Sequence, residues 1–269
     1  MKNENFLLFI DSGLGGISIL KNFLSVKNNN INVIYYADTK NFPYGEKDEK
    51  TIGRILLNIY EKIKLRFNIS MIIIACNTAS VSAIKILRDK VNLPIIGTVP
   101  AVKPAAAITK NNKIGIIATE TTARGSYLTD LVSKFASFIE VRIKGSNKLV
   151  EASENIYSGD KLKKVIDEEL SDLKNFGIDT LVLGCTHYSF LAPEINEFFE
   201  SKVNIIDSVS GVTKRIIQLM PEENSLAGNR RVLYLSSSDK DIKNKYKNFN
   251  DKYKIFNEIF SGEEICRKV

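Results

Sequence analysis

Residues 70–78 read Ser-Met-Ile-Ile-Ile-Ala-Cys-Asn-Thr, and residues 179–187 read Asp-Thr-Leu-Val-Leu-Gly-Cys-Thr-His. Each stretch is a short apolar run, a small residue, a cysteine and then polar residues that precede a helix-length segment. The two cysteines, Cys76 and Cys185, lie 109 positions apart. A continuous apolar run of this length is typical of a strand buried on both faces of a parallel sheet. The two stretches therefore predict two related parallel-sheet domains.

Two further matches occur in the same order along the chain. Residues 94–99 (Pro-Ile-Ile-Gly-Thr-Val) match residues 204–209 (Asn-Ile-Ile-Asp-Ser-Val), 110 positions later. Residues 9–12 (Phe-Ile-Asp-Ser) match residues 116–119 (Ile-Ile-Ala-Thr), 107 positions later. One short match would be chance, but three ordered matches at a nearly constant offset indicate a duplicated domain of roughly half the chain. The duplication places domain boundaries near residues 97–100 and 207–211.

Strand-like runs alternate with amphipathic stretches along the chain, which predicts an α/β protein with right-handed crossovers. Helices are expected in segments such as Lys50–Phe67, Ser80–Lys90 and Asp160–Phe176, and the Lys- and Asn-rich segment Lys240–Lys254 is expected to be a solvated helix face. The expected strands are Phe6–Ile10, Ile31–Ala37, Met71–Ala75, Pro94–Ile96, Ile114–Ala118, Phe138–Ile143, Thr180–Gly184, Val203–Ile206 and Arg231–Leu235. We expect two similar domains with mainly parallel sheets, related by a pseudo-twofold, and an active site in the cleft between them.

Composition excludes several classes of protein. The chain has 269 residues, of which 44% are hydrophobic, and no apolar run reaches the ~20 residues of a membrane span or the length of a signal peptide. Three cysteines do not make a disulfide framework, so we expect reduced thiols and a cytoplasmic protein. The net charge of +7 is compatible with a nucleic-acid binder, but the basic residues are scattered rather than clustered on one segment.

Motifs for metals, nucleotide cofactors and serine hydrolases are absent from the sequence. There is no CxxC, HExxH, Walker A or GxSxG pattern, and Ser18 breaks the dinucleotide pattern that begins at Gly13. We therefore expect neither a cofactor nor a metal ion.

The two repeated cysteines are the candidate catalytic groups. Ligands of parallel α/β sheets bind beyond the carboxyl ends of the strands, where both Cys76 and Cys185 lie. Each cysteine also precedes a helix, whose positive end favours a thiolate. Two thiols that face one ligand from opposite sides suit inversion of a stereocentre, which needs one base on each face. The alternative is that both are small buried hydrophobic residues, as we expect for Cys266.

Two other residues are candidates because of their positions. His187, the only histidine, lies two residues after Cys185, where it could act as a proton partner or hold a carboxylate. Asp11 ends the first strand, where it could tune Cys76, pair with a substrate ammonium, or simply cap the next helix.

Taken together, the motifs resemble those of the bacterial glutamate racemases, in the cofactor-independent aspartate/glutamate racemase superfamily. The resemblance is ordered and runs from about position 6 to position 210. The motifs that carry it are Ile10-Asp11-Ser12-Gly13-Leu14-Gly15-Gly16, Tyr36-Ala37-Asp38 continuing to Phe42-Pro43-Tyr44-Gly45, Ala75-Cys76-Asn77-Thr78-Ala79, Ala118-Thr119 with Thr122, and Gly184-Cys185-Thr186-His187-Tyr188.

The resemblance implies a reaction and a site. The enzyme would interconvert L-glutamate and D-glutamate without a cofactor and supply D-glutamate for peptidoglycan. Cys76 would be the base toward D-glutamate and Cys185 the base toward L-glutamate, with Asp11 and His187 as their respective assistants and Glu151 as an auxiliary acid. The implied substrate-binding residues are Asp11, Ser12, Tyr44, Gly45, Asn77, Thr78, Thr119, Thr122, Thr186 and His187.

The resemblance also implies a discontinuous first domain, residues 1–98 plus 208–269, and a second domain of residues 99–207. It leaves a homodimer open. The prolines that commonly precede the family's Leu-Val-Glu motif are missing before Leu149-Val150-Glu151, so the local loop geometry differs. The chain lacks the long N-terminal extension of precursor-activated members, so obligate activation by a cell-wall nucleotide is not expected.

Three other functions are alternatives for this sequence. The nearest enzymatic alternative is another member of the superfamily, such as an aspartate racemase, because side-chain specificity depends on pocket size. A nucleic-acid binder would account for the charge, but such a partner is not expected from scattered basic residues. A periplasmic-type amino-acid binding protein would need a signal peptide and would have no use for two thiols.

Overall fold

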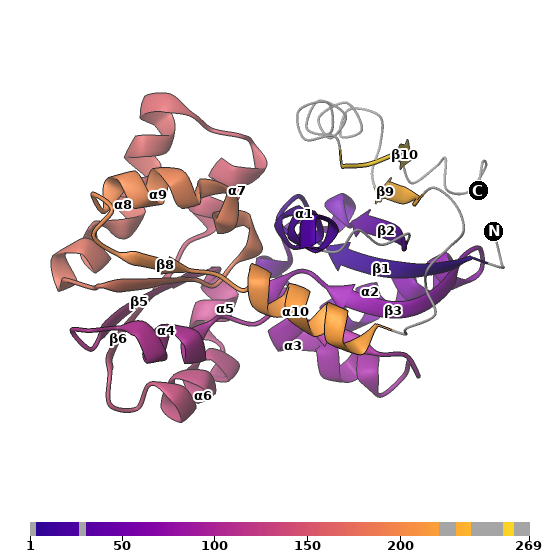
Figure 1. Ribbon diagram of the computed structural model, residues 1–269, viewed down its shortest axis with the longest axis horizontal. Coiled ribbons are helices and arrows are strands. Elements are labelled where there is room, and N and C mark those ends of the chain that lie inside the picture. Colours follow the sequence, from indigo (N-terminus) through magenta and orange to yellow (C-terminus); the bar gives the residue numbers. More distant parts are fainter. Residues whose placement is uncertain (1–3, 27–30, 221–229, 238–254, 261–269) are drawn as a thin grey trace. The chain divides into compact units, whose positions relative to one another are not determined.

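The computed structural model describes residues 4–26, 31–220, 230–237 and 255–260. These residues form two compact α/β units, and each unit is built on one parallel sheet (Figure 1). The first unit holds the described residues up to Gly97 and those from Ser210 onward, and the second holds Thr98–Val209. Within the described ranges, no helix has the length and apolar character needed to cross a bilayer.

The first unit has a six-stranded sheet in the order β10-β9-β2-β1-β3-β4. Its helices α2 and α3 pack on one face of the sheet, where Leu8, Ile34 and Ile72 contribute to a buried apolar core. Helix α1 contributes Phe23, which packs against Phe9 of β1 with ring centroids 6.0 Å apart. The elements are β1 (Asn5–Asp11), α1 (Ile17–Val26), β2 (Asn32–Ala37), the 3₁₀ turns η1 (Thr39–Asn41) and η2 (Tyr44–Glu46), α2 (Glu49–Lys64), β3 (Asn68–Ile74), α3 (Asn77–Arg88), β4 (Ile95–Gly97), α10 (Val209–Leu219), β9 (Val232–Ser236) and β10 (Glu258–Phe260).

The second unit has a four-stranded sheet in the order β6-β5-β7-β8. Buried residues of the sheet pack against helices α4 and α6 in one core that includes Ile114, Val182 and Leu128. The elements are α4 (Val102–Ile108), β5 (Lys113–Ala118), α5 (Glu120–Arg124), α6 (Ser126–Phe135), β6 (Glu140–Gly145), α7 (Asn147–Glu154), α8 (Gly159–Phe176), β7 (Thr180–Leu183), the 3₁₀ turn η3 (Thr186–Leu191), α9 (Ala192–Phe198) and β8 (Asn204–Ile206).

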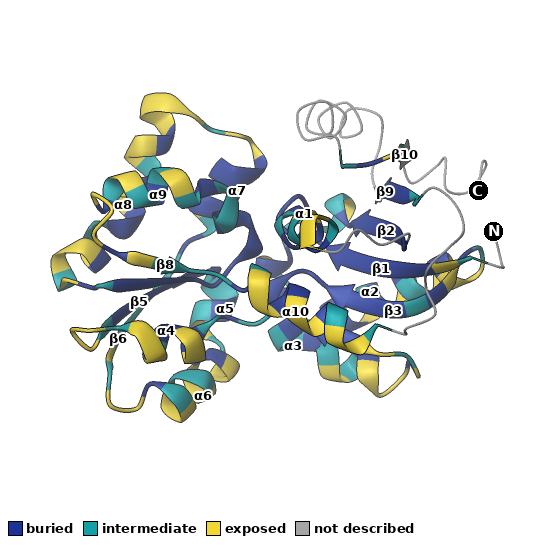
Figure 2. Ribbon diagram, viewed as in Figure 1, coloured by how far each residue is buried: buried dark blue, intermediate teal, exposed yellow. Residues whose placement is uncertain are grey.

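The two sheets share one topology. The order β2-β1-β3-β4 in the first unit corresponds to β6-β5-β7-β8 in the second, and all pairings are parallel. The expected α/β class with two similar parallel-sheet domains is confirmed. Figure 2 shows the reason for the continuous apolar runs, because the central strands of both sheets are buried while the outer sides of the helices are exposed.

The strands differ from the expected ones in two places. A strand was expected to begin at Phe138, but β6 begins at Glu140, and Phe138 is 97% exposed. The reason is a turn, closed by the hydrogen bond from Ile139 N–H to Ala136 O, that ends helix α6 just before the strand. The short strand β10 was not expected at all. The expected helix face Lys240–Lys254 and the bystander Cys266 lie outside the described residues.

Candidate active site

In the first unit, candidate residues lie at the carboxyl ends of two neighbouring strands. Ile10 of β1 pairs with Ile74 of β3, and Ala75 N–H donates to Ile10 O at 2.8 Å, so Asp11, the last residue of β1, and Cys76, two residues after β3, lie at adjacent strand ends. Cys76 is 7% exposed and is the N-cap residue of α3. The positive end of this twelve-residue helix therefore acts on the sulfur and favours an anion there.

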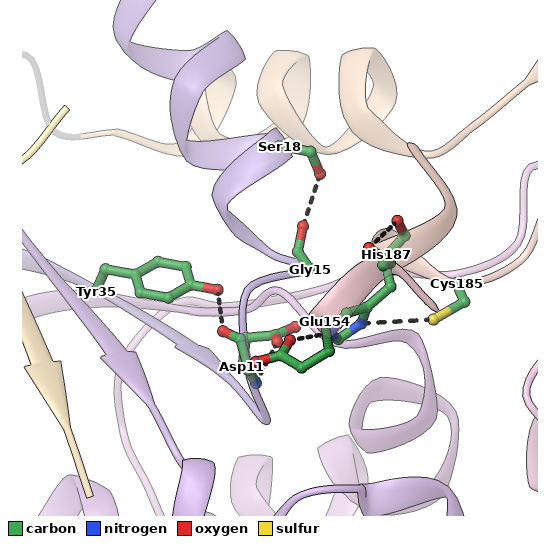
Figure 3. Close-up of polar contacts among 9 residues, drawn as sticks. Asp11, Gly15, Ser18, Tyr35, Glu154, Cys185 and His187 are labelled. Atoms are coloured by element: carbon green, nitrogen blue, oxygen red, sulfur yellow. Dashed lines mark hydrogen bonds and ion pairs between the residues drawn. The ribbon is translucent and has the colours of Figure 1, made fainter. Parts of the chain in front are cut away.

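Asp11 shapes the turn that follows β1. Its Oδ1 accepts a hydrogen bond from Gly13 N–H at 2.7 Å, and the hydroxyl of Tyr35 donates to Gly13 O at 2.8 Å (Figure 3). The carboxylate is fully buried, and Ser12 beside it is 4% exposed. The turn is thus held from both sides, which fixes where Asp11 and Ser12 lie.

Tyr44 contributes a buried phenol near the same strand ends. Its hydroxyl donates to Asp38 Oδ2 at 2.7 Å, and Asn41 Nδ2 donates to both Asp38 oxygens. Burial, the charge of Asp38 and the hydrogen bond to it raise the pKa of Tyr44 well above its ordinary value, and the charges of Cys76 and Asp11 act in the same direction. Tyr44 therefore stays a neutral phenol within electrostatic reach of both residues.

The polar residues at the start of α3 are buried as well. Thr78 is 2% exposed and Asn77 is 1% exposed. Neither side-chain atom of Asn77 hydrogen-bonds to any part of the chain that the structure describes. A buried amide without a protein partner costs free energy, so it marks a place where a polar ligand would be stabilised. Gly45, in η2 beside Tyr44, is also buried.

The second unit repeats this arrangement at β5 and β7. Ile117 pairs with Leu183, and Gly184 N–H donates to Ile117 O at 2.7 Å, so Thr119 and Cys185 follow adjacent strand ends. A Cβ on Gly184 would lie 3.0 Å from that carbonyl, so the strands need glycine to come this close. Cys185 is 6% exposed and precedes the helical turn η3.

His187 forms a chain of contacts with Cys185. Cys185 Sγ lies 3.8 Å from His187 Nδ1, and His187 Nε2 lies 2.9 Å from Glu154 Oε2 (Figure 3). Burial alone lowers the pKa of His187, but the hydrogen bonds and charges of Cys185 and Glu154 outweigh it and raise the pKa well above its ordinary value. The ring thus connects a thiol to a carboxylate inside the protein.

The candidate threonines of this unit lie after the carboxyl ends of β5 and β7 as well. Thr119 is the N-cap residue of α5, where its Oγ1 accepts from Thr122 N–H at 3.3 Å and donates to Thr122 Oγ1 at 3.0 Å. Thr186 follows Cys185 directly, and all three threonines are buried.

One expected site residue lies apart from the others. Glu151 is on the exposed side of α7, and its Oε1 accepts a hydrogen bond from the hydroxyl of Tyr157 at 2.9 Å. Sequence reasoning missed Glu154, three residues later, which is buried against His187. The helical pattern carried a signal for it, because Glu154 lies four residues after the buried Val150 and therefore on the same side of α7.

Comparisons with known proteins all match this chain to racemases. Residues 24–215 match the family model described as Asp/Glu/Hydantoin racemase. The chain is 39% identical over 214 residues to a glutamate racemase of Aliivibrio fischeri (strain MJ11), which covers 80% of each chain. It is 37% identical over 251 residues to the glutamate racemase of Aliivibrio salmonicida, which covers 92% of this chain and 93% of the other.

Solved structures match along almost the whole chain. The structure of Escherichia coli glutamate racemase in complex with L-glutamate and the activator UDP-MurNAc-Ala has a TM-score of 0.86 at 27% identity, covering 96% of this chain and 97% of that one. The Francisella tularensis glutamate racemase in complex with D-glutamate has a TM-score of 0.77 at 26% identity, covering 97% and 98%. The chain therefore belongs to the Asp/Glu/hydantoin racemase family, and within that family to the glutamate racemases.

Proposed function

We propose that this protein interconverts L-glutamate and D-glutamate by moving the proton on the α-carbon, and that it supplies D-glutamate for peptidoglycan synthesis. The proposal rests on one observation above all: two buried cysteines follow equivalent strands of two sheets with the same topology, in a chain that belongs to the glutamate racemases. Two relatives of known structure bind L-glutamate and D-glutamate respectively, which supports glutamate as the substrate.

The proposed mechanism uses one thiol on each face of the substrate. The Cys185 thiolate takes the α-proton of L-glutamate, the Cys76 thiol gives its proton to the opposite face, and D-glutamate results. The reverse reaction exchanges the two roles. Short polar groups at the carboxyl ends of the strands in both sheets would hold the carboxylates and the ammonium group of the substrate by hydrogen bonds. They include Ser12, Asn77, Thr119 and Thr186. A pseudo-twofold relation of the units, with the substrate in the cleft between them, is part of this proposal.

A water-poor site suits this chemistry. The reaction leaves negative charge on the substrate carbon, and donors fixed in a buried site stabilise such charge better than water does. Asp11 and Tyr44 would assist the Cys76 side, since Tyr44 interacts electrostatically with both Cys76 and Asp11, and Asp11 ends the strand beside the one that precedes Cys76. Because the mechanism needs two reduced thiols, we also propose a cytoplasmic location.

The test is incubation of the purified protein with L-glutamate in D₂O, followed by chiral analysis and mass spectrometry. We expect D-glutamate that carries solvent deuterium on the α-carbon. Cys76→Ser and Cys185→Ser should each lower the rate by about 10²–10⁴-fold, the usual contribution of a general acid or base. Absence of racemisation by the wild-type protein would sink the function.

Two further outcomes separate the mechanism from the function. Wild-type activity in either serine variant would leave a racemase but overturn the two-thiol mechanism. A parallel panel with L-aspartate distinguishes the neighbouring specificity, because preference for aspartate would correct the substrate and leave the reaction class intact.

A further inference from the structure

The last turn of α7 holds His187 at two points. The hydroxyl of Ser153 donates to the backbone oxygen of His187 at 2.9 Å, and Glu154 Oε2 lies 2.9 Å from the ring nitrogen Nε2. Ser153 and Glu154 are each 7% exposed and His187 is 3% exposed. One contact fixes the backbone and the other fixes the ring, so α7 determines both the position and the orientation of the imidazole.

The contact with Glu154 also fixes which ring nitrogen carries a proton. A carboxylate accepts hydrogen bonds, so Nε2 must be the donor, and the remaining nitrogen, Nδ1, faces Cys185 Sγ at 3.8 Å. A buried carboxylate is costly unless a cation or donor pairs with it. The contact with Glu154 therefore stabilises the His187 imidazolium, the form in which Nδ1, which faces the sulfur, also carries a proton.

We propose that Glu154, rather than Glu151, is the carboxylate that positions His187 for proton exchange with Cys185, an inference that rests on the proposed racemase function. The proton of the Cys185 thiol moves to the lone pair of His187 Nδ1 and leaves a thiolate beside an imidazolium. Glu154 stays ionised, keeps its hydrogen bond from Nε2–H and offsets the new positive charge. Glu154 is thus a positioning residue, because it acts on the thiol only through His187.

Glu151 cannot do the same from its place on α7. It lies less than one helical turn before Glu154, on the exposed side, and the hydroxyl of Tyr157 is its partner. Tyr157 is partly exposed, so that contact is in water and does not reach the sulfur. The two glutamates therefore form a natural pair of test site and control on one helix.

Other titratable groups lie on the elements that pack against η3. Tyr188 follows His187, and burial together with the charges of Cys185, Glu169 and Glu120 raises the pKa of Tyr188 well above its ordinary value, so that its phenol stays neutral. On α8, Glu169 pairs with Lys148 of α7 at 3.4 Å. On α9, which also packs against η3, Glu197 pairs with Lys163 at 3.5 Å and Glu194 is partly exposed.

The experiment compares Glu154→Gln with the control Glu151→Gln. Glutamine keeps the size and an acceptor oxygen but removes the charge. We expect Glu154→Gln to lower kcat by about 10–100-fold, the effect seen when carboxylates that orient metal-ligating histidines are lost, while KM changes little. Glu151→Gln should retain wild-type kcat and KM.

A second readout reports on Cys185 directly and needs no substrate. Iodoacetamide alkylation of Cys185 is followed by peptide mass spectrometry as a function of pH. Without the charge of Glu154 the imidazolium is less stable, so the pH of half-maximal alkylation should rise by about one unit in Glu154→Gln and stay unchanged in Glu151→Gln. A merely structural role for Glu154 would not move this midpoint.

The outcomes are distinct. Equal kcat and equal alkylation midpoints for the two variants overturn the proposal, as does a shift confined to Glu151→Gln. If Glu154→Gln does not fold, Glu154→Asp carries the test, since it keeps the charge: reduced kcat with an unmoved midpoint supports the proposal, and a raised midpoint overturns it. If the wild-type protein does not racemise glutamate, the proposed function fails, while the alkylation midpoints still decide the role of Glu154.

Discussion

Gly16 lies where the turn after β1 meets the end of β3, and replacing it with alanine should disturb both Asp11 and Cys76. An added Cβ would lie 2.5 Å from Ala75 Cβ and 3.1 Å from Asp11 Cβ. Neither neighbouring atom can move by side-chain rotation, because a Cβ is fixed to its backbone. To reach the 3.4 Å at which ordinary contact begins, the backbones must separate by about 0.9 Å.

This displacement predicts two effects. Overpacking of a buried site costs about 1–3 kcal/mol, so the free energy of unfolding of Gly16→Ala should fall by that amount. Asp11 and Cys76 adjoin the displaced atoms, and a misplacement of about 1 Å in an active site costs about 10²-fold in kcat/KM. Denaturant unfolding followed by circular dichroism measures the first effect, and the chiral racemisation assay measures the second.

Two controls make the prediction specific. A Cβ on Gly211, in helix α10, meets nothing within 4 Å, so Gly211→Ala should stabilise the protein by about 0.5–1 kcal/mol and leave activity unchanged. Adding Ala75→Gly to Gly16→Ala removes the closest contact and should restore part of the loss. Wild-type stability and activity in Gly16→Ala, or a double variant no better than Gly16→Ala alone, would refute the steric reasoning.

Two other substitutions test individual polar side chains. Tyr35→Phe removes the hydroxyl that donates to Gly13 O, and the free energy of unfolding should fall by about 1–3 kcal/mol in guanidinium titrations; a change below about 0.5 kcal/mol would contradict the assigned hydrogen bond. Partial burial raises the pKa of Asp179, but hydrogen bonds from Thr109 and from Lys110 N–H, among others, outweigh it and lower the pKa. The stability that this carboxylate contributes is therefore present above the unfolded pKa of about 4 and lost as pH falls through the lowered value. Asp179→Asn should show a smaller loss of thermal stability between pH 5 and pH 2.5 than the wild type, and parallel curves for the two proteins would refute this.

The sequence predicted the strands well because most of them are buried on both faces. Runs such as Met71–Ala75 and Thr180–Gly184 leave no polar face, and the structure places β3 and β7 there within a few residues. Strand β10 was missed because the charged Glu258 is one of its three residues and leaves no apolar run like the one that revealed the equally short β4. So short a run at the edge of a sheet is stabilised by its pairing with β9, which no local pattern reveals.

The candidate site was predictable as far as it follows strand ends. The places of Asp11, Cys76, Thr119 and Cys185 depend only on where β1, β3, β5 and β7 stop. The neighbours of His187 depend instead on how α7 packs against η3, and sequence spacing alone could not distinguish Glu151 from Glu154. The missing prolines before Leu149 indicated that this region departs from the usual pattern. They did not indicate which glutamate of α7 would contact His187.

The pairing of β2 with β9 has a consequence for how the chain is made. Val33 pairs with Val232, so the partner strand of β2 leaves the ribosome about 200 residues after β2 itself. At ordinary rates of synthesis this interval is about 10–40 s. During that interval β2 presents an unpaired edge, the feature that invites wrong pairing and aggregation. Thr98–Val209 is continuous in sequence and needs no later segment to complete its sheet. Synthesis therefore favours a folding order in which the middle of the chain matures first, and nascent chains stalled before Ser236 should be the species that chaperones bind.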